Sequence, residues 1–303
     1  MIRSLEEILK FARIEEIKTV SVACAQDADV LKAVTRAKQE NIAHATLVGD
    51  RGKIEAIAKE EGLDISPFEI IDITDPMEAS LKAVELVSSG QAHMFMKGLV
   101  DTSIFLKAVL NKEVGLRAGK VLSHVAVFQV EGFDRLFLVT DASMNIAPDL
   151  QTKKVIIENA VMVAHALEIE EPKVGIICAK EKADPHMPAT QEAAQLVEMN
   201  QKGEITGCLV GGPFAIDNAV SVEAARIKGI DHPVAGKADI LVAPDIEGGN
   251  ILYKTLGFMA HARNAAVIYG AKAPIILTSR ADSDDSKLNS LALGVLCACK
   301  HFS

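Results

Sequence analysis

Apolar positions along the chain follow two repeating patterns. Short runs rich in valine, isoleucine, leucine and alanine, such as Thr19–Ala25, are typical of buried strands, and longer stretches with helical periodicity, such as Asp27–Asn41, are typical of helices. In the first half the predicted strands are Thr19–Ala25, Ala45–Val48, Phe68–Ile73 and Ala92–Met96, and the predicted helices are Asp27–Asn41, Arg51–Glu61, Pro76–Ser88 and Thr102–Leu110. This alternation predicts an α/β fold with a mostly parallel sheet covered on both faces.

The alternation is interrupted once and then restarts. Val125–Val130 and Arg135–Val139 predict a β-hairpin. After it the predicted helices are Leu150–Leu167, Pro188–Asn200, Asn218–Lys228, Ile251–Ala262 and Lys287–Lys300, and the predicted strands are Lys173–Cys178, Gly207–Val210, Asp239–Ala243, Ala265–Tyr269 and Pro274–Leu277. Because 303 residues exceed what one core usually holds, we expect two α/β domains. We place the first at residues 1–145 plus 286–303 and the second at residues 146–285.

Composition and charge argue against several classes of partner. The formal net charge of −9 argues against nucleic acid or an anionic membrane surface. With no tryptophan and two tyrosines, the chain is also poor in aromatic platforms for stacking bases. No apolar run approaches the roughly 20 residues that span a bilayer. The five cysteines lie mostly in apolar runs without metal-ligand spacing, so we expect no metal and a cytoplasmic location.

Polar residues gather where predicted strands end, which is where open α/β sheets bind their ligands. Gly248, Gly249 and Asn250 precede a predicted helix and are candidates to offer backbone N–H groups to an anion, with Lys254 one turn further on. The alternative is a tight turn capped by Asn250. We therefore treat this segment as a candidate phosphate site.

A second candidate site follows Pro274–Leu277. Thr278, Ser279 and Arg280 supply two hydroxyls and a guanidinium, whose planar fork suits a phosphate. An acidic cluster comes directly afterwards, formed by Asp282, Asp284 and Asp285. This cluster either supplies a general base or only adds favourable negative charge to the N-terminus of the last helix.

Five further residues are candidates for substrate binding. Lys97 and Gly98 follow a predicted strand, Ser123 lies at the entry to the hairpin, and Asp141 and Asn145 follow its second strand. The last two belong to a segment dense in polar groups, which is either a hinge, a substrate loop or both.

Several blocks of the sequence, taken together, resemble the phosphate acetyl/butyryltransferase family. They are MKGLVDTSIFLKAVLN (Met96–Asn111), LSHVAVF (Leu122–Phe128), LVTDASMNIAPDLQTK (Leu138–Lys153), GGPFAIDNAVS (Gly211–Ser221), and PDIEGGNILYKTL through ILTSRADS. The resemblance extends over nearly the whole chain, and the first two blocks look more like the butyryl members than the acetyl members.

The resemblance implies both a fold and a reaction. The fold is two α/β domains with a central cleft, similar to the isocitrate/isopropylmalate dehydrogenase architecture. The reaction is acyl-CoA plus phosphate giving acyl phosphate plus CoA, by direct transfer in a ternary complex. Coenzyme A is then a substrate or product, and no separate cofactor is expected. We also expect a homo-oligomer, a dimer or higher.

In the acetyl members of the family, a serine, an arginine and a nearby aspartate form the catalytic set. Ser279 and Arg280 match the first two. The position at the family's interval for the aspartate is Ser286, so we assign the base to the preceding residue, Asp285, by proximity alone.

Other functions stay open at this point. A phosphate acetyltransferase differs only in the acyl group. A decarboxylating dehydrogenase of the same fold would need clustered metal-binding aspartates, which the sequence does not offer. A non-catalytic protein that binds CoA or acyl phosphate is disfavoured by the retention of Ser279, Arg280 and Asp285.

Overall fold

The computed structural model describes residues 1–278 and 282–302, and the chain folds into two compact units. Unit 1 comprises Met1–Ser4 and Val121–Asn264, and unit 2 comprises Leu5–Lys120 and Ala265–Ser303. These limits differ from the predicted domain boundaries after residues 145 and 285. The second hairpin strand, Leu136–Thr140, pairs with Ile240–Val242, which keeps the hairpin with the residues that follow it. Ile275–Ile276 pairs with Met94–Lys97, which keeps that later strand with the first half of the chain.

The strands of unit 2 form a mostly parallel sheet, as the alternation predicts. Their order is β3-β2-β1-β4-β11-β10, and only the β10–β11 pair is antiparallel. The strands are β1 (Lys18–Ala23), β2 (Ala43–Gly49), β3 (Glu69–Asp72), β4 (Met94–Lys97), β10 (Arg263–Tyr269) and β11 (Ile275–Ile276). Every residue of β4 is buried, which explains its uninterrupted apolar run MFM.

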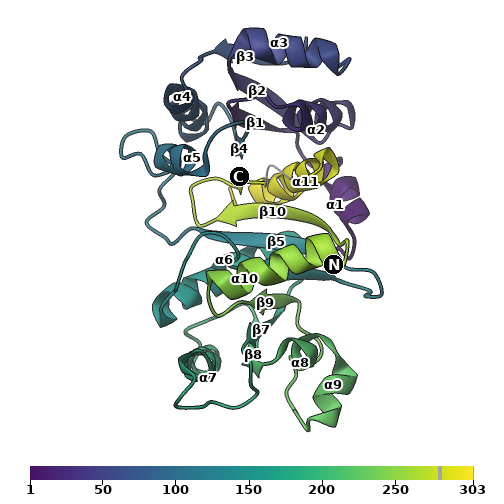
Figure 1. Ribbon diagram of the computed structural model, residues 1–303, viewed down its shortest axis with the longest axis vertical. Coiled ribbons are helices and arrows are strands. Elements are labelled where there is room, and N and C mark those ends of the chain that lie inside the picture. The colour runs from purple at the N-terminus through teal and green to yellow at the C-terminus, as the bar shows by residue number, and fades with distance from the viewer. Residues whose placement is uncertain (279–281, 303) are drawn as a thin grey trace. The chain divides into compact units, whose positions relative to one another are not determined.

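Helices cover both faces of this sheet. Figure 1 shows α4 and α5 on one side of β1 and β4, and α1, α2 and α11 on the other. The helices are α1 (Leu5–Ala12), α2 (Ala28–Gln39), α3 (Arg51–Glu60), α4 (Pro76–Ser88), α5 (Thr102–Val109) and α11 (Asp284–His301). Aspartates begin several of them, because a carboxylate at the N-cap accepts hydrogen bonds from free backbone N–H groups, as at Asp27, Asp50 and Asp75.

Unit 1 contains the predicted hairpin. β5 (Ser123–Gln129) and β6 (Leu136–Thr140) are antiparallel, with Phe128 opposite Phe137. The other strands are β7 (Lys173–Ile177), β8 (Leu209–Phe214) and β9 (Ile240–Val242), and they give the order β5-β6-β9-β7-β8 with parallel pairs beyond the hairpin. The carboxyl ends of β6, β9 and β7 therefore lie at one edge of the sheet.

The helices of unit 1 are α6 (Leu150–Ala166), α7 (Pro188–Gln201), α8 (Ile216–Val220), α9 (Val222–Ile227), α10 (Ile246–Lys254) and the π-helical turn η1 (Thr255–Met259). In Figure 1, α7 lies on one side of β7 and β8, and α8 and α9 lie on the other. The single helix predicted at Asn218–Lys228 is two short helices, separated where Ser221 adopts an extended conformation and caps the second. Across the described part of the chain, no helix has both the length and the apolar character needed to cross a membrane.

Candidate active site

Asp141 is the centre of a polar cluster in unit 1. It directly follows β6, is 4% exposed, and accepts five hydrogen bonds through its two carboxylate oxygens. Oδ1 accepts from the backbone N–H groups of His124, Ser143 and Met144 at 3.3, 3.0 and 3.1 Å. Oδ2 accepts from the backbone and the side-chain amide of Asn145 at 3.1 and 2.6 Å. The carboxylate thus fixes the loop after β6 and joins it to the start of β5.

A buried asparagine on α6 extends this cluster. Asn159 Nδ2 lies 2.9 Å from both the Val121 carbonyl oxygen and Ser123 Oγ, and Asn145 Nδ2 lies 2.8 Å from the Leu122 carbonyl oxygen. The predicted residue Ser123 is fully buried, so its hydroxyl serves the fold in this arrangement. Sequence reasoning missed Asn159. A lone asparagine on the apolar face of a long helix was the available signal, because buried amides need partners.

The predicted glycine loop is part of a helix. We expected Gly248 and Gly249 to precede a helix starting at Ile251, but α10 already begins at Ile246. The Asp245 side chain accepts from the Gly248 N–H at 2.8 Å, and the Asp245 carbonyl oxygen accepts from the Gly249 N–H at 3.0 Å. The expected helix start was therefore wrong, and both N–H groups already have partners within the helix. The predicted role of Gly248 and Gly249 in binding substrate stays a prediction.

Gly249 has a different role, which is to permit close packing. A Cβ built on Gly249 would lie 2.2 Å from the Asp141 carbonyl oxygen, closer than real side chains come to backbone. The neighbouring Asn250 donates from Nδ2 to the Ala142 carbonyl oxygen at 3.3 Å. Three of the predicted residues, Asp141, Gly249 and Asn250, therefore lie together at the carboxyl edge of the sheet of unit 1.

Lys254 ends α10 on the surface of unit 1. Its Nζ lies 5.4 Å from the ring centroid of Tyr253 and 5.6 Å from that of Phe258, so two aromatic rings orient the cation. Tyr253 in turn makes edge contacts with His124 and Phe128, which anchor α10 on β5. Lys254 is partly exposed as a residue, and its predicted role in binding an anion stays a prediction.

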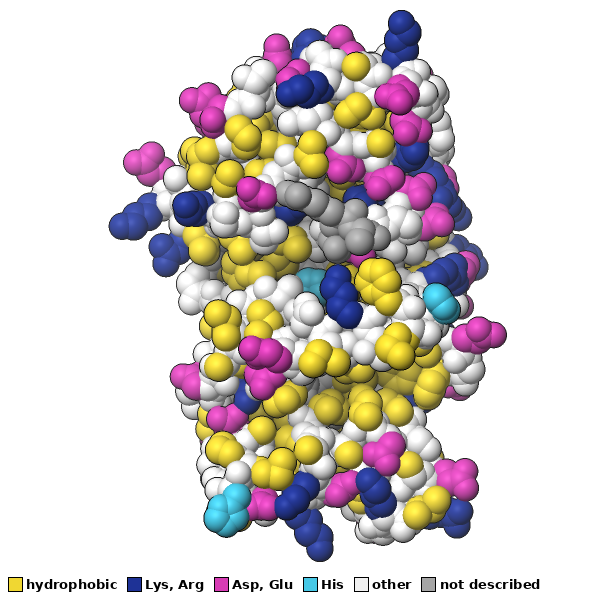
Figure 2. All heavy atoms as spheres, viewed as in Figure 1, with side chains coloured by type: hydrophobic (Ala, Val, Ile, Leu, Met, Phe, Trp, Pro, Cys, Tyr) yellow, Lys and Arg dark blue, Asp and Glu magenta, His cyan; other side chains and the backbone are white. Residues whose placement is uncertain are grey.

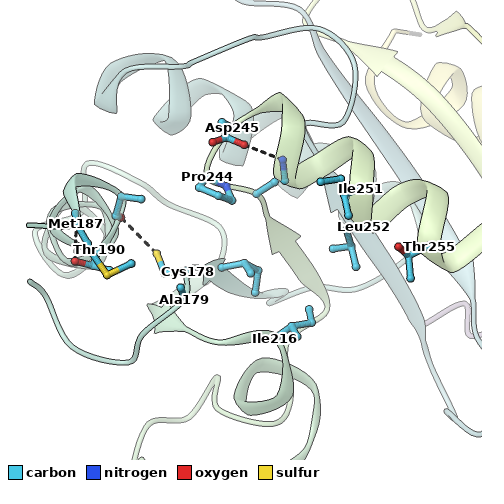
Figure 3. Close-up of a pocket in the computed structure, with 14 residues that line it drawn as sticks. Cys178, Ala179, Met187, Thr190, Ile216, Pro244, Asp245, Ile251, Leu252 and Thr255 are labelled. Atoms are coloured by element: carbon cyan, nitrogen blue, oxygen red, sulfur yellow. Dashed lines mark hydrogen bonds between the residues drawn. The ribbon is translucent and has the colours of Figure 1, made fainter.

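An apolar cavity of about 510 Å³ lies at the carboxyl ends of β7 and β9. Figure 3 shows α10 on one side of this space and the start of α7 on the other, with Ile216 of α8 below. In the view of Figure 2, hydrophobic side chains are exposed over the lower part of the molecule, where Figure 1 has α7 and α8. The lining residues are Ile177, Cys178, Ala179, Met187, Ala189, Thr190, Ile216, Ala243, Pro244, Asp245, Gly248, Ile251, Leu252 and Thr255. Sequence reasoning did not identify this cavity, because its walls come from segments far apart in the chain.

In unit 2, Lys97 and Gly98 lie where β4 ends beside β1. The Lys97 side chain is buried, and its Nζ donates to the Gly98 carbonyl oxygen at 3.3 Å. A Cβ on Gly98 would lie 2.3 Å from the Cys24 carbonyl oxygen, so a glycine is required at this crossing. Burial raises the pKa of the neighbouring Cys24 thiol, which is therefore protonated at neutral pH. The structure thus places the buried Lys97 side chain at the carboxyl edge of this sheet, and its predicted role in binding substrate stays a prediction.

The predicted catalytic segment is only partly described. Thr278 is 7% exposed at the end of the β11 region, whereas Ser279 and Arg280 lie outside the described residues. Asp285 lies in the first turn of α11, and its side chain is 68% exposed. Its Oδ1 accepts from Arg36 Nη1 at 2.5 Å. The structure therefore gives Asp285 a partner on α2, and its role as a base stays a prediction.

The rest of the acidic cluster begins α11. Ser283 caps the helix by accepting from the Ser286 N–H at 3.2 Å, and Asp284 shares the first turn with Asp285. The buried Lys287 donates to the Asp282 carbonyl oxygen at 2.5 Å. Negative charge at this helix N-terminus is favourable, so the capping alternative for the cluster describes at least part of what these residues do. Across residues 1–278 and 282–302, no group of histidine, cysteine, aspartate or glutamate could hold a metal ion.

The sequence matches one protein family over nearly its whole length. The family is described as phosphate acetyl/butaryl transferase, and the matches cover residues 4–79 and 76–295. The matched residues include the predicted site residues of unit 1, such as Asp141 and Gly249, and those of unit 2, such as Lys97 and Asp285.

Three similar proteins illustrate the family. The phosphate butyryltransferase of Clostridium beijerinckii is 52% identical over 99% of this chain and 100% of its own length. The phosphate acetyltransferase of Thermotoga maritima is 45% identical over 97% of this chain and 99% of its own. Among solved structures, a branched-chain phosphotransacylase from Enterococcus faecalis has a TM-score of 0.82 and 34% identity, covering 94% of this chain and 100% of that one.

Proposed function

The chain belongs to the phosphate acetyl/butyryltransferase family, and we propose that it moves a short-chain acyl group, with butyryl preferred, between coenzyme A and inorganic phosphate. The observation that carries this proposal is the 52% identity to a phosphate butyryltransferase over 99% of this chain and 100% of that protein. Acetyl is the second candidate, because a phosphate acetyltransferase is 45% identical over nearly as much of the chain. The reaction is acyl-CoA plus phosphate giving acyl phosphate plus CoA.

The proposed mechanism is direct transfer in a ternary complex. Phosphate attacks the thioester carbonyl, negative charge grows on the carbonyl oxygen and then on the departing sulfur, and CoA leaves. Arg280 would bind phosphate through its planar fork and neutralise charge, and the Ser279 hydroxyl would donate to the oxyanion or the sulfur. In the reverse direction a carboxylate would remove the proton of the CoA thiol, which is mostly protonated at neutral pH.

We propose that this carboxylate comes from the acidic cluster at the start of α11. Asp285 is our candidate, yet it forms an ion pair with Arg36, and accepting a proton would weaken that pair. Comparing Asp285→Asn with Asp282→Asn and Asp284→Asn identifies the base, because only the variant that lacks it should lose turnover. Full activity in all three variants would refute carboxylate base catalysis in this chain.

Several expectations from the sequence remain proposals. These are the isocitrate/isopropylmalate dehydrogenase-like arrangement with a central cleft, the homo-oligomeric state, the cytoplasmic location and the absence of a separate cofactor. The substrate-binding roles of Ser123, Asp141 and Asn145 are of the same kind. Their support is the family relationship, together with the hydrogen bonds that join Asn145 to Asp141 and to the Leu122 carbonyl oxygen next to Ser123.

The decisive experiment follows release of free CoA thiol from acetyl-CoA and butyryl-CoA with and without inorganic phosphate. We expect thiol release that depends on phosphate, is accompanied by acyl phosphate, and is faster with butyryl-CoA. Release without phosphate would indicate a hydrolase. CoA binding without release would indicate a binding protein, and reduction of a nicotinamide cofactor with a hydroxy-acid substrate would indicate the dehydrogenase alternative. Equal or faster turnover of acetyl-CoA would refute the butyryl preference alone.

A further inference from the structure

We propose that Lys287 is a positioning residue for the transfer reaction, because it holds the backbone directly after the candidate catalytic segment. This inference rests on the proposed function and adds a residue that sequence reasoning did not single out. Lys287 is the fourth residue of α11, and its Nζ donates to the Asp282 carbonyl oxygen at 2.5 Å. Asp282 follows Arg280 by two residues in the chain. The lysine therefore holds the backbone two residues from the group proposed to bind phosphate.

The helix directs this side chain towards the segment that precedes it. Side chains in an α-helix lean towards the N-terminus, so a long side chain near the start of α11 extends back beyond the first turn. The carbonyl that it contacts belongs to the residue before the N-cap, Ser283. Ser283 Oγ in turn accepts from the Ser286 N–H at 3.2 Å. The entry to α11 is thus held twice, once by the cap and once by the lysine.

This position is unfavourable for a lysine on local grounds. The Lys287 side chain is 4% exposed, and burying an ammonium costs free energy unless it is well paired. The start of a helix also carries partial positive charge, which repels a cation. The carboxylate of Asp29 on α2 lies 3.9 Å from Nζ and is itself 46% exposed, so it offsets only part of these costs. A residue that breaks local rules in this way is expected where function requires it.

The chain is also held on the other side of the candidate segment. Thr278 is 7% exposed and comes directly after the region of β11, which pairs with the buried strand β4. Ser279 and Arg280 lie outside the described residues, and in the sequence they stand between Thr278 and Asp282. A displacement of about 1 Å at a reacting group can cost about a hundredfold in rate. Loss of either anchor should therefore impair the reaction more than it impairs the fold.

The test replaces the ammonium with an apolar side chain of similar length. Lys287→Met suits a buried site, and the carboxylate that it leaves behind, that of Asp29, is partly exposed to water. Lys287→Arg is the conservative variant, because it keeps a donor for the Asp282 carbonyl oxygen. Lys18→Met is the matched control. Lys18 is also buried in unit 2 and paired with an exposed carboxylate, that of Glu16, but it is the first residue of β1 and so lies at the opposite end of that strand from its carboxyl end.

For each protein, kcat and the KM values for inorganic phosphate and acyl-CoA are measured by thiol release, with the acyl-CoA that the wild type turns over faster. Lys287→Met should lower kcat/KM for phosphate about tenfold to a hundredfold and raise the KM for phosphate at least about fivefold. The KM for acyl-CoA should change less than about twofold, because Arg280 is proposed to bind phosphate. Lys287→Arg should recover part of the loss, and Lys18→Met should match wild type. Partial unfolding lowers kcat by the inactive fraction but leaves both KM values unchanged, so the KM for phosphate separates positioning from stability.

Three results would overturn this proposal. The first is a Lys287→Met protein whose kcat and KM for phosphate both stay within about twofold of wild type. The second is a loss confined to kcat, which a purely structural role explains. The third is a Lys287→Arg protein as impaired as Lys287→Met, since the donor to Asp282 would then not be what matters. All three leave the proposed function intact, whereas a wild-type protein without phosphate-dependent thiol release would overturn the proposed function itself.

Discussion

Replacing Gly249 with alanine should displace α10 from the loop that follows β6. In the structure, a Cβ at this position would lie 2.2 Å from the Asp141 carbonyl oxygen, 3.0 Å from its carbonyl carbon and 3.1 Å from Ala142 Cα. All three contacts are with backbone, which cannot rotate away as a side chain can. The helix or the loop must therefore move, and the hydrogen bond from Asn250 to Ala142 should weaken with it.

The expected cost combines two opposing effects. Overpacking of a well-packed site costs about 1–3 kcal/mol. Alanine is a better helix former than glycine by about 1 kcal/mol, which offsets part of this cost. The net cost is then up to about 2 kcal/mol. At roughly 2–4 °C for each kcal/mol in a domain of this size, Gly249→Ala should lower the midpoint of thermal unfolding by up to about 8 °C. Turnover should fall as well, because the Asp141 loop belongs to the candidate site.

Gly257→Ala is the matched control, since no heavy atom lies within 4 Å of a Cβ built there. It should leave the unfolding temperature unchanged or raise it slightly. Calorimetry on the wild type and the two variants measures both effects. If Gly249→Ala unfolds at the same temperature as Gly257→Ala, the close approach of α10 to the Asp141 backbone is refuted.

Three other outcomes follow from the same contacts. Asp141→Asn replaces one acceptor oxygen of the carboxylate with an NH₂ group, so at least two donors lose their partner. The free energy of unfolding, measured in urea, should fall by about 2–5 kcal/mol. A change below about 0.5 kcal/mol would contradict the hydrogen bonds assigned to Asp141. Asp285→Asn should lower the free energy of unfolding by less than about 1 kcal/mol, because its ion pair with Arg36 is exposed. The same variant should lower turnover of CoA with acyl phosphate by roughly 10²–10⁴. Arg36→Gln should keep that turnover, and an equal loss in both variants would assign the effect to the ion pair. Burial raises the pKa of Cys178 and Cys208 to about 11, above the ordinary value of about 8.5. Because the folded state holds these protons more tightly than the unfolded state, the free energy of unfolding should fall as pH rises from about 8.5 towards 11. Urea midpoints measured across this range should fall less steeply when both cysteines are alanine.

The candidate site shows how far local sequence reasoning extends. The strand ends after β4 and β6 were correctly identified as polar, and Lys97 and Asp141 lie there. The expectation that Gly248 lies in a loop before the helix was wrong, because a glycine pair before an apolar run is compatible with a loop or with the first turn of a helix. The Asp245 carboxylate decides for the helix by accepting from the Gly248 N–H. A sequence pattern does not show which donor will satisfy a given acceptor.

The sequence alone determined the order and type of most elements. Apolar runs without charged interruptions specify buried parallel strands, and aspartates at N-caps specify where helices such as α2, α3 and α4 begin. These signals act within a few residues of the chain, so they can be read locally. The resemblance of ordered motifs to one family likewise needed only the linear sequence.

Tertiary structure decided everything that depends on segments meeting across long sequence separations. Asn159 reaches Ser123 across 36 residues, and Asp285 reaches Arg36 across 249. The apolar cavity is lined by residues from Ile177 to Thr255, and each of its wall residues alone looks like an ordinary core or surface position. Packing geometry, which no local pattern contains, determines which of these side chains meet and which leave a space between them.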